Sequence, residues 1–420
     1  MKYLTTDQIN YQNSKLFIED SDVAEITDQF GTPIYIYSKQ HFTDQYSLFT
    51  NAFRTIKHKI FYAMKANSNI SVVSTFLKLG AGIDANSEGE LYRAFKAKAL
   101  PQNIILTSVG KTKDEIKLAL EKDILLIKAE SEEEVELINK IAGSMNKTAK
   151  VAVRVNPDVD PVTHPYISTG LSANKFGVDI ATALKIYKRR NEFSNIMFTG
   201  IDMHIGSQIT KPVPFYEAIS KLSDLFFRIR SEGLVLKHFD IGGGIGVSYN
   251  DEKSFPINEL ADRIIPLLKK LECEIIFEPG RFLTANGGIL VTEVLYNKKN
   301  GNKNFIVVDA AMNDLLRPSI YQTYHHIQPV NLNSDRDIMT ADIVGPVCES
   351  GDYFAKDRKI PETRSGEHLA IMSSGAYGMV MSSNYNARRR PAEVLVDGNT
   401  FSLIRSRETL EHLVWDEKII

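Results

Sequence analysis

The chain alternates short apolar runs with longer stretches of helical periodicity from residue 59 onward. Such an alternation predicts parallel βα units. The expected strands cover residues 59–64, 82–85, 103–107, 124–129, 150–155, 198–205, 237–243 and 273–279. The expected helices between them cover residues 71–79, 88–99, 114–122, 133–142, 181–190, 214–230 and 257–272. Eight units within about 220 residues match the size of a TIM-like (β/α)₈ barrel, so we expect an α/β fold.

The pattern changes after Arg281 to isolated strand-like runs at residues 304–310, 337–345, 368–374 and 392–406. The dipeptide Asp397-Gly398 inside the last run favours a hairpin. We therefore expect a C-terminal β domain, a sandwich or small barrel, over residues 281–420. The barrel would cover residues 31–280, and the N-terminal segment 1–30, too short to fold alone, would pack with the β domain.

Three of the expected helices begin with a hydroxyl residue that is followed three positions later by a glutamate. This spacing predicts a capping box, in which the two side chains satisfy free backbone amides at the start of the helix. The pairs are Ser87 with Glu90, Thr112 with Glu115, and Ser131 with Glu134.

Composition narrows the possible partners. The formal net charge of the 420 residues is only -2, and no long run of one sign occurs, so a nucleic-acid partner is not indicated and a small-molecule substrate is expected. Two cysteines form neither a disulfide framework nor a zinc motif, which fits a reducing cytoplasm. The start lacks the apolar stretch of a signal peptide, and no segment has about 18 consecutive apolar residues, so no membrane association is expected.

Polar residues and glycines stand at the ends of most of the expected strands. In a barrel of this kind the active site lies at the carboxyl ends of the strands, so these residues should converge on one opening. They are Lys65, Asp84, Arg154, His204, Gly242, Gly243, Gly244, Glu278 and Arg281.

Lys65 in "YAMKAN" follows the first expected strand. An apolar setting lowers the proton affinity of a lysine and frees its amine to attack a carbonyl group. The alternative is a lysine at the barrel rim whose stem packs on apolar surface and whose charge stays in water.

The stretch "DIGGGIG" follows the seventh expected strand, where barrels often hold a phosphate through backbone amides that only glycine brings close. Its spacing is not that of a dinucleotide fold, and no good helix follows at once, so that reading is weak. A tight turn is the alternative. "SVGKT" at residues 108–112 is not a P-loop, because the first glycine of that motif would fall at Ile105. His325 and His326 lack the spacing of metal ligands, and no metal is expected.

Glu278 and Arg281 in "EPGR" allow two interpretations. They could form an ordinary ion pair at the rim, or the carboxylate could face a ring nitrogen while the guanidinium binds a substrate carboxylate. His204 in "DMHIGSQ" could stack on a cofactor, although a lone histidine is more often structural.

Cys348 lies in "GPVCESGD", residues 345–352, close to Glu349 and Asp352. Nearby carboxylates disfavour the thiolate, so this thiol suits a proton donor better than a nucleophile. The alternative is a small apolar residue in a packed loop.

Six motifs in this order, "YAMKAN", "HIGSQ", "GGGIG", "EPGR", "GPVCESGD" and "GAYG", together resemble the fold-type III pyridoxal-phosphate decarboxylases, whose barrel is like that of alanine racemase. The resemblance runs from about residue 30 to residue 415. Residues 156–178, "NPDVDPVTHPYISTGLSANKFGV", are similar to the branch of the family that acts on diaminopimelate.

The resemblance implies pyridoxal 5'-phosphate as cofactor. Lys65 would hold it covalently, Glu278 would bond its pyridine nitrogen and His204 would stack on its ring, with Lys65, His204 and Cys348 as the catalytic residues. A further group would surround the cofactor or its phosphate: Asp84, Arg154, Ser207, Gly242, Gly243, Gly244 and Tyr377.

The resemblance also implies the reaction, decarboxylation of meso-2,6-diaminopimelate to L-lysine and CO₂, the last step of lysine biosynthesis. The second amino acid head of this substrate calls for cations on its carboxylate. The residues expected to bind the substrate are Arg281, Arg317, Tyr321, Glu349 and Tyr377. Cys348 would be delivered to the active site of a partner subunit, so a homodimer with shared active sites is expected.

Two alternatives remain open. One is a decarboxylase of another basic amino acid, such as ornithine, arginine or carboxynorspermidine. The other is a non-catalytic pyridoxal-phosphate-binding regulator, which would be expected to lack Lys65 or Cys348.

Overall fold

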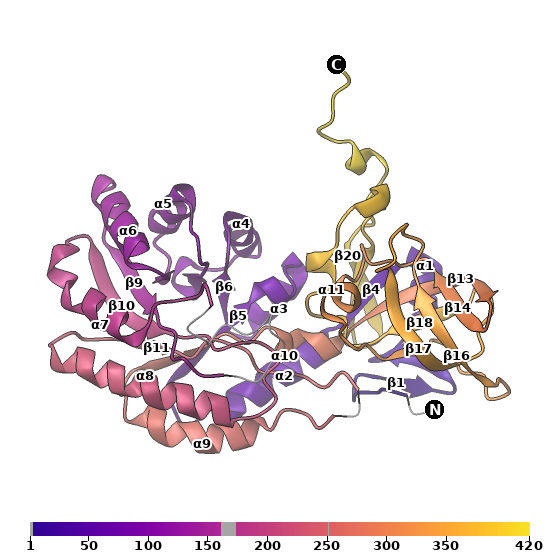
Figure 1. The fold of residues 1–420 in the computed structure, drawn as a ribbon, viewed down its shortest axis with the longest axis horizontal. Helices are drawn as coiled ribbons and strands as arrows, with labels where there is room; N and C mark the ends of the chain where they lie inside the picture. Colours follow the sequence, from indigo (N-terminus) through magenta and orange to yellow (C-terminus); the bar gives the residue numbers. More distant parts are fainter. Residues whose placement is uncertain (1–2, 161–173, 251) are drawn as a thin grey trace. The chain divides into compact units, whose positions relative to one another are not determined.

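The structure is a computed structural model that describes residues 3–160, 174–250 and 252–420. It divides into two compact units (Figure 1). The barrel unit comprises Gln45–Val247 and Ser254–Phe282, and the sheet unit comprises Met1–Asp44, Ser248–Lys253 and Leu283–Ile420. The α/β fold with a barrel and a separate, mostly sheet domain is confirmed.

Eight parallel strands close the barrel in the order β10-β11-β12-β5-β6-β7-β8-β9. Each expected strand has its counterpart, so the count made from apolar runs is confirmed. The strands are β5 (His58–Ala63), β6 (Gly82–Ala85), β7 (Ile104–Leu106), β8 (Leu126–Ala129), β9 (Ala149–Arg154), β10 (Ile196–Asp202), β11 (His238–Asp240) and β12 (Glu274–Phe277).

Helices follow most of these strands and surround the barrel in Figure 1. They coincide with the seven expected helical stretches because one face of each is apolar and packs inward. They are α3 (Ile70–Lys78), α4 (Glu88–Lys96), α5 (Lys113–Lys122), α6 (Glu132–Ser144), α7 (Ile180–Lys188), α8 (Val213–Ser231) and α9 (Ile257–Lys269).

One of the three expected capping boxes is complete. At the start of α5 the Thr112 hydroxyl accepts the Glu115 amide, and the Glu115 carboxylate accepts the Thr112 amide. Ser87 and Ser131 cap α4 and α6 with their hydroxyl groups in the same way. Their glutamates instead accept the amides of Asn86 and Glu130, one residue before the cap. The expectation of a reciprocal box was therefore wrong for these two helices.

The barrel interior changes from apolar to charged along its strands. Leu126, Ala152 and Ile276 belong to one buried apolar cluster. Because side chains two residues apart point to the same face of a strand, the next inward positions on these strands are Lys128, Arg154 and Glu278. The charged positions lie at or directly after the carboxyl ends of the strands, which is the end where barrel enzymes carry their active sites.

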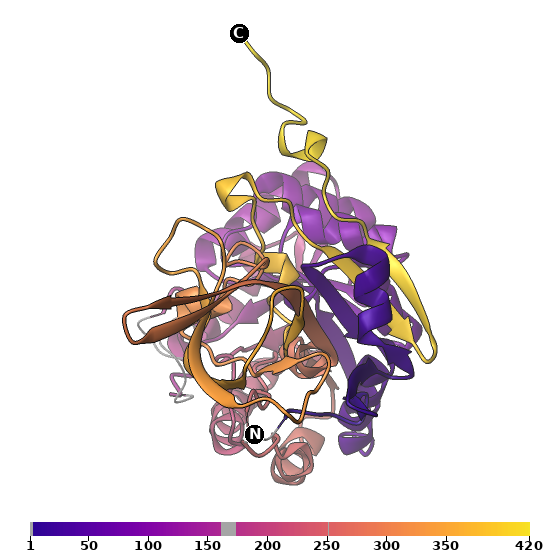
Figure 2. The same ribbon diagram turned by 90° about the vertical axis from the view of Figure 1, so that its right-hand side faces the viewer.

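The sheet unit contains a nine-stranded sheet with β17-β16-β14-β13-β4-β19-β20 as its main path, while β18 pairs with β13 and β15. Its strands are β4 (Ile34–Ser38), β13 (Gly288–Asn300), β14 (Lys303–Val308), β15 (Ile327–Pro329), β16 (Ile338–Val344), β17 (Tyr353–Pro361), β18 (His368–Ile371), β19 (Ala392–Asp397) and β20 (Thr400–Arg405). β19 and β20 form the expected hairpin, with Asp397 opposite Thr400. Figure 2 turns this sheet toward the viewer.

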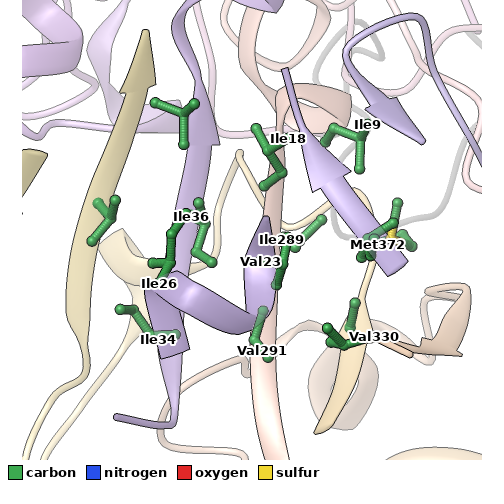
Figure 3. Close-up of a cluster of buried hydrophobic side chains, with 14 of the residues drawn as sticks. Ile9, Ile18, Val23, Ile26, Ile34, Ile36, Ile289, Val291, Val330 and Met372 are labelled. Carbon is green, nitrogen blue, oxygen red and sulfur yellow. The ribbon is translucent and has the colours of Figure 1, made fainter. Parts of the chain in front are cut away.

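The N-terminal residues pack on this sheet. β1 (Ile9–Gln12), β2 (Lys15–Ile18) and β3 (Ser21–Asp22) form a small sheet that precedes α1 (Val23–Phe30). Ile9, Ile18 and Ile26 belong to one buried cluster with side chains of β4 and β13, as Figure 3 shows. β4 itself lies between β13 and β19, so the beginning of the chain supplies an interior strand of the sheet.

Candidate active site

Residues from several barrel strands meet at one end of the barrel. Lys65 lies in the short helical turn Met64–Ala66 directly after β5, and Asp84 is the penultimate residue of β6. Arg154 ends β9, and His204 comes two residues after β10. Since all the strands are parallel, these positions share the carboxyl end of the barrel. The Lys65 ammonium group lies 3.7 Å from the Asp84 carboxylate.

His204 is oriented by the glycine segment after β11. The Gly243 amide donates to its Nδ1 over 3.2 Å, so this nitrogen carries no proton and the neutral ring holds its proton at Nε2. Desolvation, together with the positive charges of Arg154, Lys65 and Lys128, holds the pKa of His204 well below its usual range. The ring is therefore a neutral, flat surface rather than a cation.

The segment Gly242, Gly243 and Gly244 runs against its neighbours too closely for side chains. A Cβ on Gly243 would lie 2.2 Å from the Glu278 carbonyl oxygen, and Gly244 has a φ of +102°. The Gly242 amide donates to Asp240 and the Gly243 amide to His204. Within the described residues, the Gly244 amide meets no acceptor, which leaves it available to an anion. Among the described residues after this segment, the next helix is α9, which begins at Ile257, so none follows at once, as the sequence predicted.

Arg154 is held by a carboxylate that sequence reasoning did not single out. Its Nη1 donates to Glu130 over 2.7 Å, and Glu130 also accepts the Gly177 amide over 2.9 Å. The guanidinium group lies 4.9 Å from the centre of the Phe176 ring. Arg154 is thus buried in a fixed orientation beside the barrel opening.

Four charged side chains form a buried cluster inside the barrel, here called the Lys128 cluster. Lys128 Nζ lies 2.8 Å from Asp202 and 2.6 Å from Asp240, and it donates to Glu278. Lys128 and Asp240 are completely buried, and Asp202 and Glu278 are nearly so. The three carboxylates lie within 4.8 Å of one another, as metal ligands would, but the ammonium group contacts each of them.

The protonation of the Lys128 cluster follows from burial and mutual charge. Burial raises the pKa of Glu278 well above its usual range, and Asp240 and Asp84 add to this while Lys128 opposes it. Burial likewise raises the pKa of Asp240 to about 7, with Lys128 again opposing. Burial by itself would lower the pKa of Lys128, but attraction by Asp202, Asp240 and Glu278 outweighs it, and this pKa is raised well above the usual value.

Arg281 and Ser207 contact each other within the barrel unit. Arg281 Nη2 donates to the Ser207 hydroxyl over 3.1 Å, and the guanidinium group is buried. The sequence assigned Arg281 to a substrate carboxylate and Ser207 to the cofactor phosphate. The contact brings a positive charge next to the residue expected to hold the phosphate.

The sheet unit carries the remaining expected site residues. Arg317 begins the short helix α11 (Arg317–Tyr321) and is buried. Its Nη2 donates to the Tyr249 hydroxyl over 3.1 Å, and its Nε donates to His325 Nε2 over 3.4 Å. The guanidinium carbon lies 5.9 Å from the centre of the Tyr321 ring. Tyr249 and His325 were not expected to have these roles.

His325 is fixed in one tautomer by its two contacts. Its Nδ1 lies 2.8 Å from the Met372 carbonyl oxygen, which can only accept, so Nδ1 carries the proton. Nε2 is then the acceptor that faces Arg317. The neighbouring His326 contacts the Tyr324 hydroxyl with its Nδ1 over 3.2 Å.

The loop that contains Cys348 is built around Asp352. The Asp352 carboxylate accepts the amides of Val347 and Met312, each over 2.7 Å, and is buried. Cys348 and Glu349 are exposed on the same loop. Within the single chain, Asp352 and Val347 rather than the Cys348 thiol are buried in this loop, which does not support the alternative of a packed apolar residue.

Two further sequence features are placed by the structure. Lys111 of "SVGKT" is buried and pairs with Glu134 over 3.1 Å, so this stretch is an internal ion pair and not a phosphate loop. Tyr377 adopts a φ of +55°, an uncommon conformation for a side-chain-bearing residue. Residues 161–173 of the stretch similar to the diaminopimelate branch lie outside the described residues.

The functional candidates that sequence reasoning missed are Lys128, Glu130, Asp202, Asp240, Tyr249 and His325. A signal existed for part of this set. Lys128 stands within the apolar run "ILLIKA", and Asp202 and Asp240 stand inside expected strands. A charged residue inside a buried strand needs a partner, and an acidic residue in another strand can supply it.

Among the helices in the described parts of the chain, none combines the length and the apolar character needed to cross a bilayer.

Comparisons with known proteins agree over nearly the whole chain. The family described as "Pyridoxal-dependent decarboxylase, pyridoxal binding domain" matches residues 39–285. A diaminopimelate decarboxylase of Aquifex aeolicus is 46% identical, covering 97% of this chain and 96% of that relative. A diaminopimelate decarboxylase of Haemophilus influenzae is 45% identical, with 96% and 97% covered.

Solved structures show the same similarity. The diaminopimelate decarboxylase of Helicobacter pylori complexed with L-lysine is 40% identical, with a TM-score of 0.90 over 93% of this chain and 98% of that one. The diaminopimelate decarboxylase of "m. jannaschii", in co-complex with L-lysine, is 36% identical, with a TM-score of 0.94 over 99% of this chain and 98% of that one. A lysine/ornithine decarboxylase of Vibrio vulnificus, at 23% identity and a TM-score of 0.79, shares the fold.

Proposed function

The chain belongs to the pyridoxal-dependent decarboxylases, in the group of its diaminopimelate decarboxylase relatives, and from this premise we propose that it decarboxylates meso-2,6-diaminopimelate to L-lysine and CO₂. The observation that carries the proposal is the shared location of an amine, a buried carboxylate and a glycine segment at the carboxyl ends of β5, β12 and β11. The cofactor would be pyridoxal 5'-phosphate.

The residues at the barrel opening fit this cofactor. The Gly244 amide faces no acceptor among the described residues, and a side chain on Gly243 would collide with the Glu278 backbone, so the segment permits close approach of a phosphate. Ser207 and Arg281 supply a hydroxyl group and a positive charge. The neutral ring of His204 offers a flat surface for stacking.

The chain's own residues would divide the work as follows. Lys65 would hold the cofactor through its amine, while Asp84 and Arg154 lie in the same barrel unit beside it. Glu278 would hold the proton of the pyridine nitrogen. When bound, the cofactor supplies an electron sink for the electron pair left behind by CO₂. The Cys348 thiol would return a proton to the carbon that lost the carboxylate.

Substrate choice would depend on the second amino acid head of diaminopimelate. Arg281 and Arg317 are cations with fixed hydrogen bonds, and Glu349 would bind the distal ammonium group. Guanidinium groups recognise carboxylates with defined geometry. A substrate that lacks the distal carboxylate would leave these groups without their partner, which disfavours ornithine and similar amines.

Cys348 and Glu349 are exposed in the single chain, which supports a role in a second subunit's active site. We therefore include in the proposal a homodimer in which the loop of residues 345–352 enters the partner's barrel. Tyr377 would complete the site together with this loop.

Lysine formation from meso-diaminopimelate with added pyridoxal phosphate tests the proposal directly. Wild-type protein should release CO₂ and lysine, and Lys65→Ala should release neither. Lys59→Ala is the matched control, since Lys59 lies near the amino end of the same strand and should leave turnover intact. Full activity of Lys65→Ala, or a preference for ornithine or arginine in a substrate panel, would refute it.

A mixing experiment tests the shared site. Lys65→Ala and Cys348→Ala subunits should each be inactive alone. A 1:1 mixture should recover about a quarter of wild-type activity, because about half of the dimers are mixed and one of the two sites in each mixed dimer has both residues. No recovery after verified subunit exchange would place both residues in the same chain's site. A regulator without catalytic function would show no turnover in any combination.

A further inference from the structure

Lys128 reaches across the interior of the barrel. It lies on β8, and Glu278 directly follows β12, which is separated from β8 by three strands on either side of the closed barrel. The remaining contacts are Asp202 at the end of β10 and Asp240 at the end of β11. One ammonium group thus ties together the carboxyl ends of three strands.

Stability alone does not account for this cluster. The interior layers of such barrels are usually filled by branched apolar side chains. Burying several charged side chains costs more desolvation free energy than burying apolar side chains of the same volume. Replacing a buried ion cluster by apolar residues therefore often leaves stability unchanged or raises it. The Lys128 cluster lies one inward position beyond the apolar cluster of Leu126 and Ile276, at the end of the barrel that carries Lys65 and His204. Its location therefore points to function.

We propose that Lys128 is a positioning residue for Glu278: its ammonium group favours the ionised form of the Glu278 carboxylate and fixes its orientation, while Asp202 and Asp240 fix the ammonium group in turn. The inference rests on the proposed function, because it takes Glu278 to face the pyridine nitrogen. It adds a residue that no sequence motif identified.

The electrostatics of the cluster give the direction of the effect. The charged groups that act on Glu278 are Asp84 on β6, Lys128 on β8, Asp202 on β10 and Asp240 on β11. Three of these four raise the pKa of Glu278, and only Lys128 lowers it. Without Lys128, Glu278 would therefore keep its proton to higher pH and would be less able to hold the proton of a ring nitrogen.

The decisive experiment compares four forms of the full-length protein: wild type, Lys128→Met, Lys128→Met/Asp240→Asn and Lys59→Met. Methionine keeps most of the volume of lysine without its charge. The double variant restores the formal charge of the cluster, and asparagine at 240 can still accept the Gly242 amide. Lys59→Met controls for removing a barrel lysine, since Lys59 donates to Asn103 and lies near the amino end of β5.

Two readouts are needed. One is the pH profile of kcat and KM for diaminopimelate with the cofactor bound. The other is the pH midpoint of the Glu278 carboxyl band in infrared spectra, assigned by comparison with Glu278→Gln, which requires neither cofactor nor substrate. Thermal unfolding of each variant identifies a merely structural effect.

Lys128→Met should lower kcat about 10- to 100-fold, as expected for loss of a group that orients a reacting residue, with little change in KM. The acid limb of the profile and the infrared midpoint should both move upward by about one pH unit or more. In the double variant, the acid limb and the infrared midpoint should both return toward their wild-type positions. Lys59→Met should match wild type.

An unshifted acid limb and infrared midpoint in Lys128→Met would overturn the inference, even if its melting temperature fell. So would a double variant no closer to wild type than the single one. If Lys128→Met does not fold, Asp240→Asn decides. Its acid limb and its infrared midpoint should both move to lower pH, and an unchanged infrared midpoint overturns the inference. Failure of the wild type to bind pyridoxal phosphate would instead remove the proposed function, while the infrared titration would still report on Lys128 and Glu278.

Discussion

The ammonium group of Lys65 lies 3.7 Å from the carboxylate of Asp84, a residue with no exposed surface. Within the described part of the chain, neither carboxylate oxygen of Asp84 has a hydrogen-bond partner. A buried carboxylate without hydrogen bonds is stabilised only by nearby positive charge, which here comes from Lys65. The negative charge of Asp84 in turn raises the pKa of Glu278.

Asp84→Asn should lower the pKa of Glu278, because it removes one of the negative charges that raise it. The infrared midpoint of Glu278 should therefore move to lower pH, opposite to the shift expected for Lys128→Met. Asp114→Asn, on the exposed face of α5, is the control and should leave the midpoint unchanged. A midpoint that rises in Asp84→Asn would contradict the electrostatic account.

Gly243→Ala should damage the cofactor site. Its Cβ would lie 2.2 Å from the Glu278 carbonyl oxygen, so the backbone must shift. Overpacking of this kind destabilises by about 1 to 3 kcal/mol, and the affinity for pyridoxal phosphate should fall as well. Urea unfolding and a cofactor titration measure the two effects. Gly110→Ala, whose Cβ would meet no atom within 4 Å, should change neither.

Tyr249→Phe should weaken substrate binding through Arg317. The substitution removes the acceptor of Arg317 Nη2, and one hydrogen bond contributes about 1 kcal/mol, which corresponds to roughly fivefold in KM for diaminopimelate. Arg317→Ala should raise this KM further, and it should affect shorter amino acids far less. Tyr35→Phe, which also removes a buried hydrogen bond within the sheet unit, is the control. Equal effects on all substrates would count against the role of Arg317.

Asp352→Ala should loosen the loop that carries Cys348 and Glu349. Two amides, of Val347 and Met312, lose their acceptor, at about 1 to 3 kcal/mol for each group left buried without one. We expect kcat to fall because the thiol is no longer held in place, and the melting temperature to fall as well. Asp335→Ala on an exposed loop should have no effect on turnover. An unchanged kcat in Asp352→Ala would show that turnover does not require the hydrogen bonds with which Asp352 holds this loop.

His41 should make the free energy of unfolding depend on pH. Burial lowers its pKa from 6.5 to about 4. Below pH 6.5 the unfolded chain binds a proton at this imidazole while the folded chain does not, so stability falls progressively down to about pH 4. The loss reaches up to about 3 kcal/mol.

His41→Gln should therefore flatten the decline in stability between pH 6.5 and pH 4, as measured by urea unfolding at several pH values. His412→Gln, at an exposed histidine, should keep the wild-type slope. If the free energy of unfolding of His41→Gln declined with falling pH as steeply as that of the wild type, other groups would cause the loss of stability in acid.

Much of the barrel could be predicted from local patterns. Apolar runs of a few residues, separated by stretches of helical periodicity, identified all eight strands and the seven helices, because burial on both faces of a strand and on one face of a helix leaves a local signature. The reciprocal capping box at Thr112 was also predictable. The boxes at Ser87 and Ser131 were not, since which amide a glutamate reaches depends on the turn before the helix.

The sequence by itself determined the eight βα units and the placement of Lys65, Asp84, Arg154 and Glu278 at the ends of strands, because both follow from short-range periodicity. Only the tertiary structure decided that Lys128 meets Asp202 and Glu278, which are 74 and 150 residues away. It likewise decided that β4 lies between β13 and β19. Such pairings depend on how the barrel closes and how the sheet is ordered, and these arrangements leave no periodic trace along the chain.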